Sequence, residues 1–100
     1  MSRTRQPSQR RIGAAERAIA VLDTLAETGE LGTNEIARRT GMTPSTVSRQ
    51  LGTLAASGLV ERVESTGRYR LGIRIVHLAN AVLARLDVLR SSGTLLAAVR

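Results

Sequence analysis

Apolar residues recur at helical spacing in the first third of the chain and predict a helix over residues 14–28. They return every three or four residues, as the buried face of a helix requires; they are Ala15, Ala18, Ile19, Leu22, Leu25 and Ala26. Gly29 follows as a C-terminal cap. Leu31 and Gly32 then form a short link to the next element.

Two shorter helices are predicted after this link. The first runs from Thr33, a suitable N-cap, to Gly41, which ends it. The second is capped by Thr43, and Pro44 occupies its first position, where the missing amide costs no hydrogen bond. This helix extends to about residue 57, and its apolar stripe is formed by Val47, Leu51 and Leu54.

A β-hairpin is predicted next, from two short segments at residues 59–64 and 68–71 that are separated by a Ser-Thr-Gly turn. Successive side chains of a strand point to opposite faces. The second segment therefore turns two side chains towards the core, Tyr69 and Leu71, and two outward, Arg68 and Arg70.

The segment from Ile73 to Leu89 predicts a long helix that is apolar on more than one side. Twelve of its seventeen residues are apolar, which is more than one buried face accounts for. We expect one side to pack on this domain and the other to pack on a partner chain or a further domain. Residues 73–90 are therefore predicted to be a linker or dimerisation helix, and residues 91–100 the start of a truncated C-terminal region.

The two short helices carry the spacing of a helix-turn-helix. Counting Thr33 as the first position, Ala37 is the fifth, Gly41 the ninth and Val47 the fifteenth. The fifth position must be small because the helices cross there, the ninth takes a positive φ, and the fifteenth locks the second helix onto the first. The sequence therefore predicts a mainly α fold with a small β-hairpin: a winged helix-turn-helix over residues 13–72, followed by a long linker helix. An ordinary three-helix core without a DNA role is the alternative.

The charge of the chain favours a polyanionic partner. The formal net charge is +7, and all fifteen basic residues are Arg. Residues 1–12 contain four arginines and no acid, and predict a basic disordered arm. Residues 13–32 contain four acids and one arginine, and the balance is positive again from Thr33 onward.

The residue inventory argues against catalysis. The chain has no Cys, and its single His, His77, lies on a largely apolar helix. There is no carboxylate pair with suggestive spacing and no Gly-rich phosphate loop. We therefore expect no enzymatic activity, no cofactor and no metal. No stretch has the pattern of a secretory signal or a membrane span, which, with the absence of Cys, fits the cytoplasm.

The helix over residues 44–57 is the predicted recognition helix. Its polar positions lie opposite the stripe that contains Val47, and the N-terminal residues of such a helix meet base edges in the major groove. We expect Arg49 to read a base, bidentate to guanine, with a phosphate contact as the alternative. The other candidates for base reading are Ser45, Thr46 and, at the rim, Gln50.

Contacts with the DNA backbone are expected around this reading edge. Thr33 offers a helix N-terminus to a phosphate. Arg68 and Arg70 share one face of the wing, where they would follow a phosphate strand or enter the minor groove. The remaining candidates are Arg38, Arg39, Thr43, Ser48 and Thr53. A solvated surface is the alternative for the arginines.

Several stretches together resemble the IclR (isocitrate lyase regulator) family of transcription regulators. Residues 16–25 are similar to the opening helix of that family, and residues 34–49, which end in Ser-Thr-Val-Ser-Arg, to its helix-turn-helix. Its wing strands are matched by Gly58-Leu59-Val60-Glu61-Arg62 and Tyr69-Arg70-Leu71-Gly72. The resemblance covers residues 16–89. MarR-type regulators share the Ser-Thr-Val-Ser-Arg start, so a MarR-like regulator remains an alternative.

The resemblance implies a homodimer that binds double-stranded DNA as a repressor or activator at the bacterial nucleoid, with Ser45, Thr46 and Arg49 reading DNA. We expect the two recognition helices of such a dimer to lie about 34 Å apart. The family also has a C-terminal domain for a small-molecule effector, which these hundred residues do not contain. A second departure is Gln50, which stands where the family usually has an aliphatic residue. A winged helix used for protein interaction or dimerisation, and RNA binding, are the other functions considered.

Overall fold

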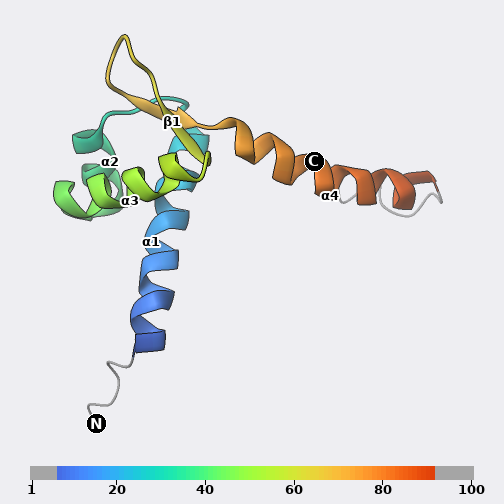
Figure 1. Ribbon diagram of the computed structural model, residues 1–100, viewed down its shortest axis with the longest axis horizontal. Helices are drawn as coiled ribbons and strands as arrows, with labels where there is room; N and C mark the ends of the chain where they lie inside the picture. The colour runs from blue at the N-terminus through green and yellow to red at the C-terminus, as the bar shows by residue number, and fades with distance from the viewer. Residues whose placement is uncertain (1–6, 92–100) are drawn as a thin grey trace.

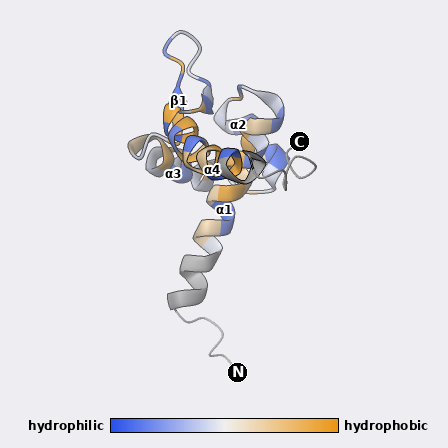
Figure 2. Ribbon diagram, turned by 90° about the vertical axis from the view of Figure 1, so that its right-hand side faces the viewer, coloured by the Kyte–Doolittle hydropathy of each residue, from blue (hydrophilic) through white to orange (hydrophobic). Residues whose placement is uncertain are grey.

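The computed structural model describes the backbone of residues 7–91 and the side chains of residues 13–87. Helices α1, α2 and α3 form a body, and the hairpin rises from it on the side opposite to the long free part of α1 (Figures 1 and 2). Helix α4 leaves the body sideways as a rod (Figure 1). The order of the elements is α1 (Pro7–Thr28), α2 (Thr33–Thr40), α3 (Pro44–Ala56), β1 (Val60–Arg62), β2 (Tyr69–Leu71) and α4 (Ile73–Ser91). This order confirms the predicted winged helix-turn-helix followed by a long helix.

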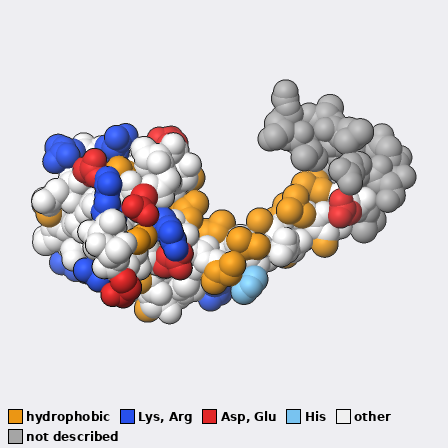
Figure 3. All heavy atoms as spheres, turned by 90° about the horizontal axis from the view of Figure 1, so that it is seen from above, with side chains coloured by type: hydrophobic (Ala, Val, Ile, Leu, Met, Phe, Trp, Pro, Cys, Tyr) orange, Lys and Arg blue, Asp and Glu red, His pale blue; other side chains and the backbone are white. Residues whose placement is uncertain are grey.

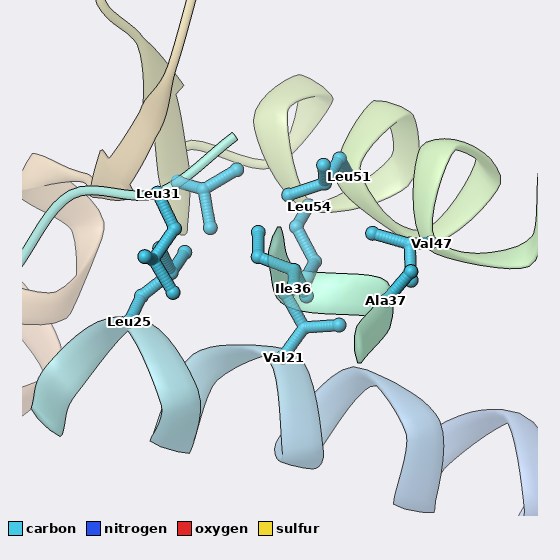
Figure 4. Close-up of a cluster of buried hydrophobic side chains, with 9 residues drawn as sticks. Val21, Leu25, Leu31, Ile36, Ala37, Val47, Leu51 and Leu54 are labelled. Atoms are coloured by element: carbon cyan, nitrogen blue, oxygen red, sulfur yellow. The ribbon is translucent and has the colours of Figure 1, made fainter. Parts of the chain in front are cut away.

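The core of the body is built from aliphatic side chains, since the chain contains no Phe or Trp. Its buried members converge from α1, the link between α1 and α2, α2, α3 and the hairpin (Figure 4); they are Val21, Leu25, Leu31, Ile36, Ala37, Val47, Leu51, Leu54 and Val60. The predicted stripe of α3 is thereby confirmed. Tyr69 and Leu71 are half-buried and pack against this core, as the strand alternation predicted.

Helix α1 differs from its prediction at its start and on its buried face. It begins at Pro7, so residues 7–12, which were expected in a disordered arm, are helical; residues 1–6 lie outside the described part. Val21 is fully buried, whereas Ile19 is 55% exposed, and Ala15 and Ala26 are exposed as well. Apolar residues stand on several faces of this helix, so spacing alone did not identify the inward face.

The start of α2 also corrects the prediction. Its N-cap is Gly32, and Thr33 is the first residue of the helix. The Gly32 N–H donates a hydrogen bond to the Glu35 carboxylate at 3.4 Å, so this glutamate satisfies the N–H of the N-cap residue. The N-cap residue contributes no side-chain bond to the helix amides, which the Thr33 hydroxyl was expected to provide.

The turn between α2 and α3 follows the prediction. Gly41 ends α2 with a φ of 78°, the left-handed conformation expected at the ninth position. Thr43 caps α3, because its Oγ1 accepts the Thr46 N–H at 3.2 Å, and Pro44 opens the helix.

The hairpin is antiparallel and is anchored to the link between α1 and α2. Its register places Val60 opposite Leu71 and Arg62 opposite Tyr69. The Leu31 N–H donates to the Tyr69 carbonyl at 3.0 Å, and the Tyr69 N–H donates to the Leu31 carbonyl at 2.8 Å. Leu31 thus adds a one-residue third strand, which holds the base of the wing against the body.

Helix α4 begins one residue after β2. The residue between them, Gly72, is buried, and its N–H donates to the Leu59 carbonyl at 2.8 Å. The Arg74 N–H donates to the Gly58 carbonyl at 3.1 Å, and the Arg74 guanidinium donates to the Ser57 carbonyl at 3.3 Å. These bonds tie the first turn of α4 to the end of α3.

Helix α4 points away from the body and carries along its length a row of apolar side chains that stand in the open (Figure 3). Those that are at least 47% exposed are Ile73, Val76, Leu78, Val82 and Leu83. The expectation that one side of this helix packs on the domain is therefore wrong, because the helix leaves the body instead of lying along it.

Candidate nucleic-acid interface

Helix α3 has a buried apolar face and an exposed polar face. Val47 and Leu51 are fully buried against the body, and this fixes the rotation of the helix about its axis. On the opposite side Ser45, Arg49 and Thr53 are exposed. The helix therefore presents its polar face in the orientation that the sequence predicted.

Three hydroxyl groups gather at the N-terminus of α3. The Thr43 hydroxyl donates to Thr46 Oγ1 at 2.9 Å, and it lies 3.4 Å from the Ser45 hydroxyl. Because Thr46 Oγ1 accepts this bond, its own proton remains available for an outside acceptor. Thr43 thus orients the two hydroxyls that were predicted to read bases.

The longer side chains of α3 differ in their surroundings. Arg49 is exposed and forms no ion pair within the described part of the chain, so its five N–H donors are available. Gln50 is half-buried next to Leu51, which leaves it at the edge of the polar face. Ser48 is exposed on the flank.

Both predicted arginines of the wing are bound to carboxylates. Arg68 Nη2 lies 2.7 Å from Glu35 Oε1 on α2, and Arg70 Nε lies 2.7 Å from Glu61 Oε2 on β1. Arg68 therefore reaches back to the helix-turn-helix and does not stand free near the wing tip. Each guanidinium retains further N–H donors, and Arg68 remains 42% exposed.

The Glu35 carboxylate is ionised at neutral pH. The hydrogen bond from Arg68 contributes most to holding its pKa below the ordinary value, and the Gly32 N–H and the positive charges of Arg68 and Arg38 act in the same direction. Partial desolvation opposes them and is outweighed. A charged carboxylate therefore stands between the first turn of α2 and the wing.

On α2, the predicted phosphate contacts Arg38 and Arg39 are exposed. Arg38 borders a shallow open hollow of about 420 Å³ at the junction of α2 and α3. The same hollow is bordered by Asn34, a polar residue in the first turn of α2 that the sequence pattern did not indicate.

Arg62 on β1 is a second polar residue that the sequence pattern did not indicate. It is exposed, and its guanidinium lies close to Gly67 in the turn of the wing. Strand alternation starting from the buried Val60 would have turned Arg62 inward, so the pattern contained no signal for it.

Across residues 13–87, no group of three or more His, Cys, Asp or Glu side chains could hold a metal ion. None of the described helices is long and apolar enough to cross a membrane.

Comparison with known proteins gives the family of this fold. The model of the IclR helix-turn-helix domain matches residues 14–64. Among solved structures, the chain is similar to an IclR family transcriptional regulator from Brucella abortus, with a TM-score of 0.66 and 38% identity, over 73% of this chain and 28% of that one.

Curated relatives are transcriptional regulators. The chain is 36% identical over 85 residues to the HTH-type transcriptional regulator BhcR of Paracoccus denitrificans, which covers 85% of this chain and 30% of that protein. It is 41% identical over 76 residues to the glycerol operon regulatory protein of Streptomyces griseus, which covers 74% of this chain and 30% of that protein. The chain thus spans about 30% of the length of these relatives. The family model decides between the two families that the sequence suggested: the chain belongs to the IclR family of helix-turn-helix transcriptional regulators.

Proposed function

We propose that this chain binds double-stranded DNA sequence-specifically as part of a transcriptional regulator, with α3 in the major groove and the wing on the backbone or in the minor groove. The observation that carries the proposal is the exposed polar face of α3, which the buried Val47 and Leu51 hold outward. The net charge of +7 adds attraction to phosphates that does not depend on sequence.

Base reading is assigned to four side chains of α3. Arg49 binds the O6 and N7 atoms of a guanine with two parallel hydrogen bonds. Ser45 and Thr46 contact bases at the N-terminal end, where their hydroxyls are oriented by Thr43. Gln50 contacts the rim of the site, because its half-buried position keeps it from the centre of the polar face.

The remaining polar residues bind the DNA backbone. Thr33 stands at the first position of α2 and offers a backbone N–H that the helix itself does not use. Arg68 and Arg70 contact phosphates from the wing through the donors that their carboxylate partners leave free. The other backbone contacts are Arg38, Arg39, Thr43, Ser48 and Thr53.

The active form is a homodimer in which α4 contributes to the interface. Its exposed row of apolar side chains (Figure 3) would be costly to leave in water. A two-fold pair of α4 helices covers such a row and presents two recognition helices to a near-palindromic site.

The whole regulator acts in the cytoplasm, where its DNA target lies. It responds to a small-molecule effector only if it carries a further domain outside this chain. No enzymatic activity and no cofactor are assigned to these residues.

The test is a salt-titrated binding assay on sites selected from a random duplex library, with wild type, Arg49→Ala and, as a control of equal charge on α1, Arg17→Ala. We expect affinity to fall steeply with salt for all three. Arg49→Ala should lose about 1–3 kcal/mol at one base pair and accept other bases there, whereas Arg17→Ala should leave base preference unchanged. Absence of salt-sensitive duplex binding by the wild type would refute the proposal and favour a protein-interaction module. Unchanged specific and non-specific binding by Arg49→Ala would refute the assignment of α3.

A further inference from the structure

The ion pair between Glu35 and Arg68 joins two parts of the interface that are 33 residues apart in sequence. Glu35 lies in the first turn of α2, and Arg68 lies at the loop end of β2. The other ion pair identified among the described side chains, Glu61–Arg70, lies entirely within the hairpin. Of these two ion pairs, only Glu35–Arg68 connects the hairpin to the helix-turn-helix.

The wing needs such a support because its strands are three residues long, and an isolated two-stranded hairpin is marginal in water. Its base is held by the Leu31–Tyr69 bridge. The next residue towards the loop is Arg68, so the pair with Glu35 extends the attachment from the base of the wing towards its tip.

The backbone of Arg68 is itself well held. Its N–H donates to Thr66 Oγ1 at 3.1 Å, and its carbonyl accepts the Val63 N–H at 2.7 Å. The position of the Arg68 side chain is therefore coupled to the turn through these two hydrogen bonds. On the other side, Glu35 is held in place by the Gly32 N–H.

We infer that Glu35 is a positioning residue, which fixes the wing and the Arg68 guanidinium in the orientation that contacts the DNA backbone. The inference rests on the proposed function. It gives an acid a role at a surface that binds a polyanion: its repulsion of phosphate is outweighed by the order that it imposes on Arg68. A Glu35 that merely competed with phosphate for Arg68 would have the opposite effect on binding.

The chain offers a matched control in Glu61→Gln. Glu61 lies 2.7 Å from Arg70 of β2, and its substitution makes the same change of charge at the carboxylate partner of the other wing arginine. Because both partners belong to the hairpin, this variant leaves the attachment of the wing to α2 intact.

The experiment measures affinity for a selected duplex, and hydroxyl-radical footprints, for wild type, Glu35→Gln, Glu61→Gln, Arg68→Gln and the double variant Glu35→Gln/Arg68→Gln. We expect Glu61→Gln to bind as tightly as wild type or more tightly, because an acid has been removed. Glu35→Gln should bind about three- to tenfold more weakly despite the same gain in net charge, a size expected for coupling between residues in direct contact. It should also lose the backbone protection from the wing and retain that from α3.

The double variant separates positioning from a merely structural role. If Glu35 acts through Arg68, adding Glu35→Gln to Arg68→Gln causes no further loss of affinity. An equal loss in both backgrounds would overturn the inference, because Glu35 would then act through the cap of α2. Tighter binding by Glu35→Gln, matching Glu61→Gln, would overturn it as well. If the wild type binds no duplex DNA, the proposed function itself fails, which is a different result from any of these.

Discussion

Gly72 packs so closely against Gly58 that a Cβ added at Gly72 would collide with the Gly58 carbonyl oxygen. The contact lies where the hairpin, the end of α3 and the start of α4 meet. Gly72→Ala should therefore lower the free energy of unfolding by roughly 1–3 kcal/mol, since the obstructing atoms belong to the backbone and yield poorly. Urea denaturation of both proteins checks this. An unchanged urea midpoint would show that the junction has room for the added methyl group.

Gly52 provides the opposite case of the same substitution. It lies inside α3, is exposed, and a Cβ there would meet nothing within 4 Å. Glycine is about 1 kcal/mol worse than alanine in a helix interior, so Gly52→Ala should raise the free energy of unfolding by about that amount. We expect DNA affinity to fall at the same time, because the added methyl group stands on the side of α3 that carries Ser45 and Arg49. Greater stability with undiminished affinity would show that DNA does not approach the helix at this position.

Leu51 is the central anchor of α3 and is fully buried. Leu51→Ala should cost about 2–5 kcal/mol of unfolding free energy, because it leaves a cavity among side chains from several elements. Leu78→Ala removes the same atoms from a side chain on α4 that is 52% exposed, and should change the unfolding of the body by less than about 0.5 kcal/mol. Both are measured at concentrations where the chain is monomeric. Equal losses would contradict the separation of α4 from the core.

The contribution of Glu35 to the free energy of unfolding should decrease as the pH falls into the acid range. Its pKa is lower in the folded protein than in the unfolded chain, where it is about 4.3. The contribution is therefore fully present above about pH 4.3 and is lost as the pH falls through the lower folded pKa. The difference in unfolding free energy between wild type and Glu35→Gln should be constant near neutrality and should shrink in acid. A difference that grows as the pH falls would contradict the ion pair as its source.

The helix-turn-helix itself could be predicted because its signals are local. Gly41 was identified from its place in the turn, and its φ of 78° confirms the conformation assigned to it. Pro44 and Thr43 likewise marked the start of α3 within one residue. The buried stripe of α3 could be predicted from the helical spacing of its apolar residues, because its other positions are polar or small.

The errors arise where the outcome depends on distant partners. Ile19 and Val21 are both β-branched aliphatic residues on one helix, and only the placement of α2 and α3 decides that Val21 is buried. Arg68 could be placed on an outward strand face, but its carboxylate partner comes from a helix 33 residues earlier. No local pattern encodes such a pair. The departure of α4 from the body is a third case, because an apolar helix does not specify which surface will cover it.

The direct joining of β2 to α4 through Gly72 has a consequence for the spacing of a DNA site. The 19 residues of α4 form a stiff rod roughly 28 Å long, at about 1.5 Å per residue, and no flexible loop separates this rod from the wing. Two copies joined along their α4 helices would therefore hold their recognition helices at one distance and one angle. Inserting one base pair between the half-sites rotates one of them by about 35° relative to the other. A dimer built in this way would bind half-sites at one fixed spacing. It would tolerate base substitutions in the DNA between the half-sites far better than insertions or deletions there.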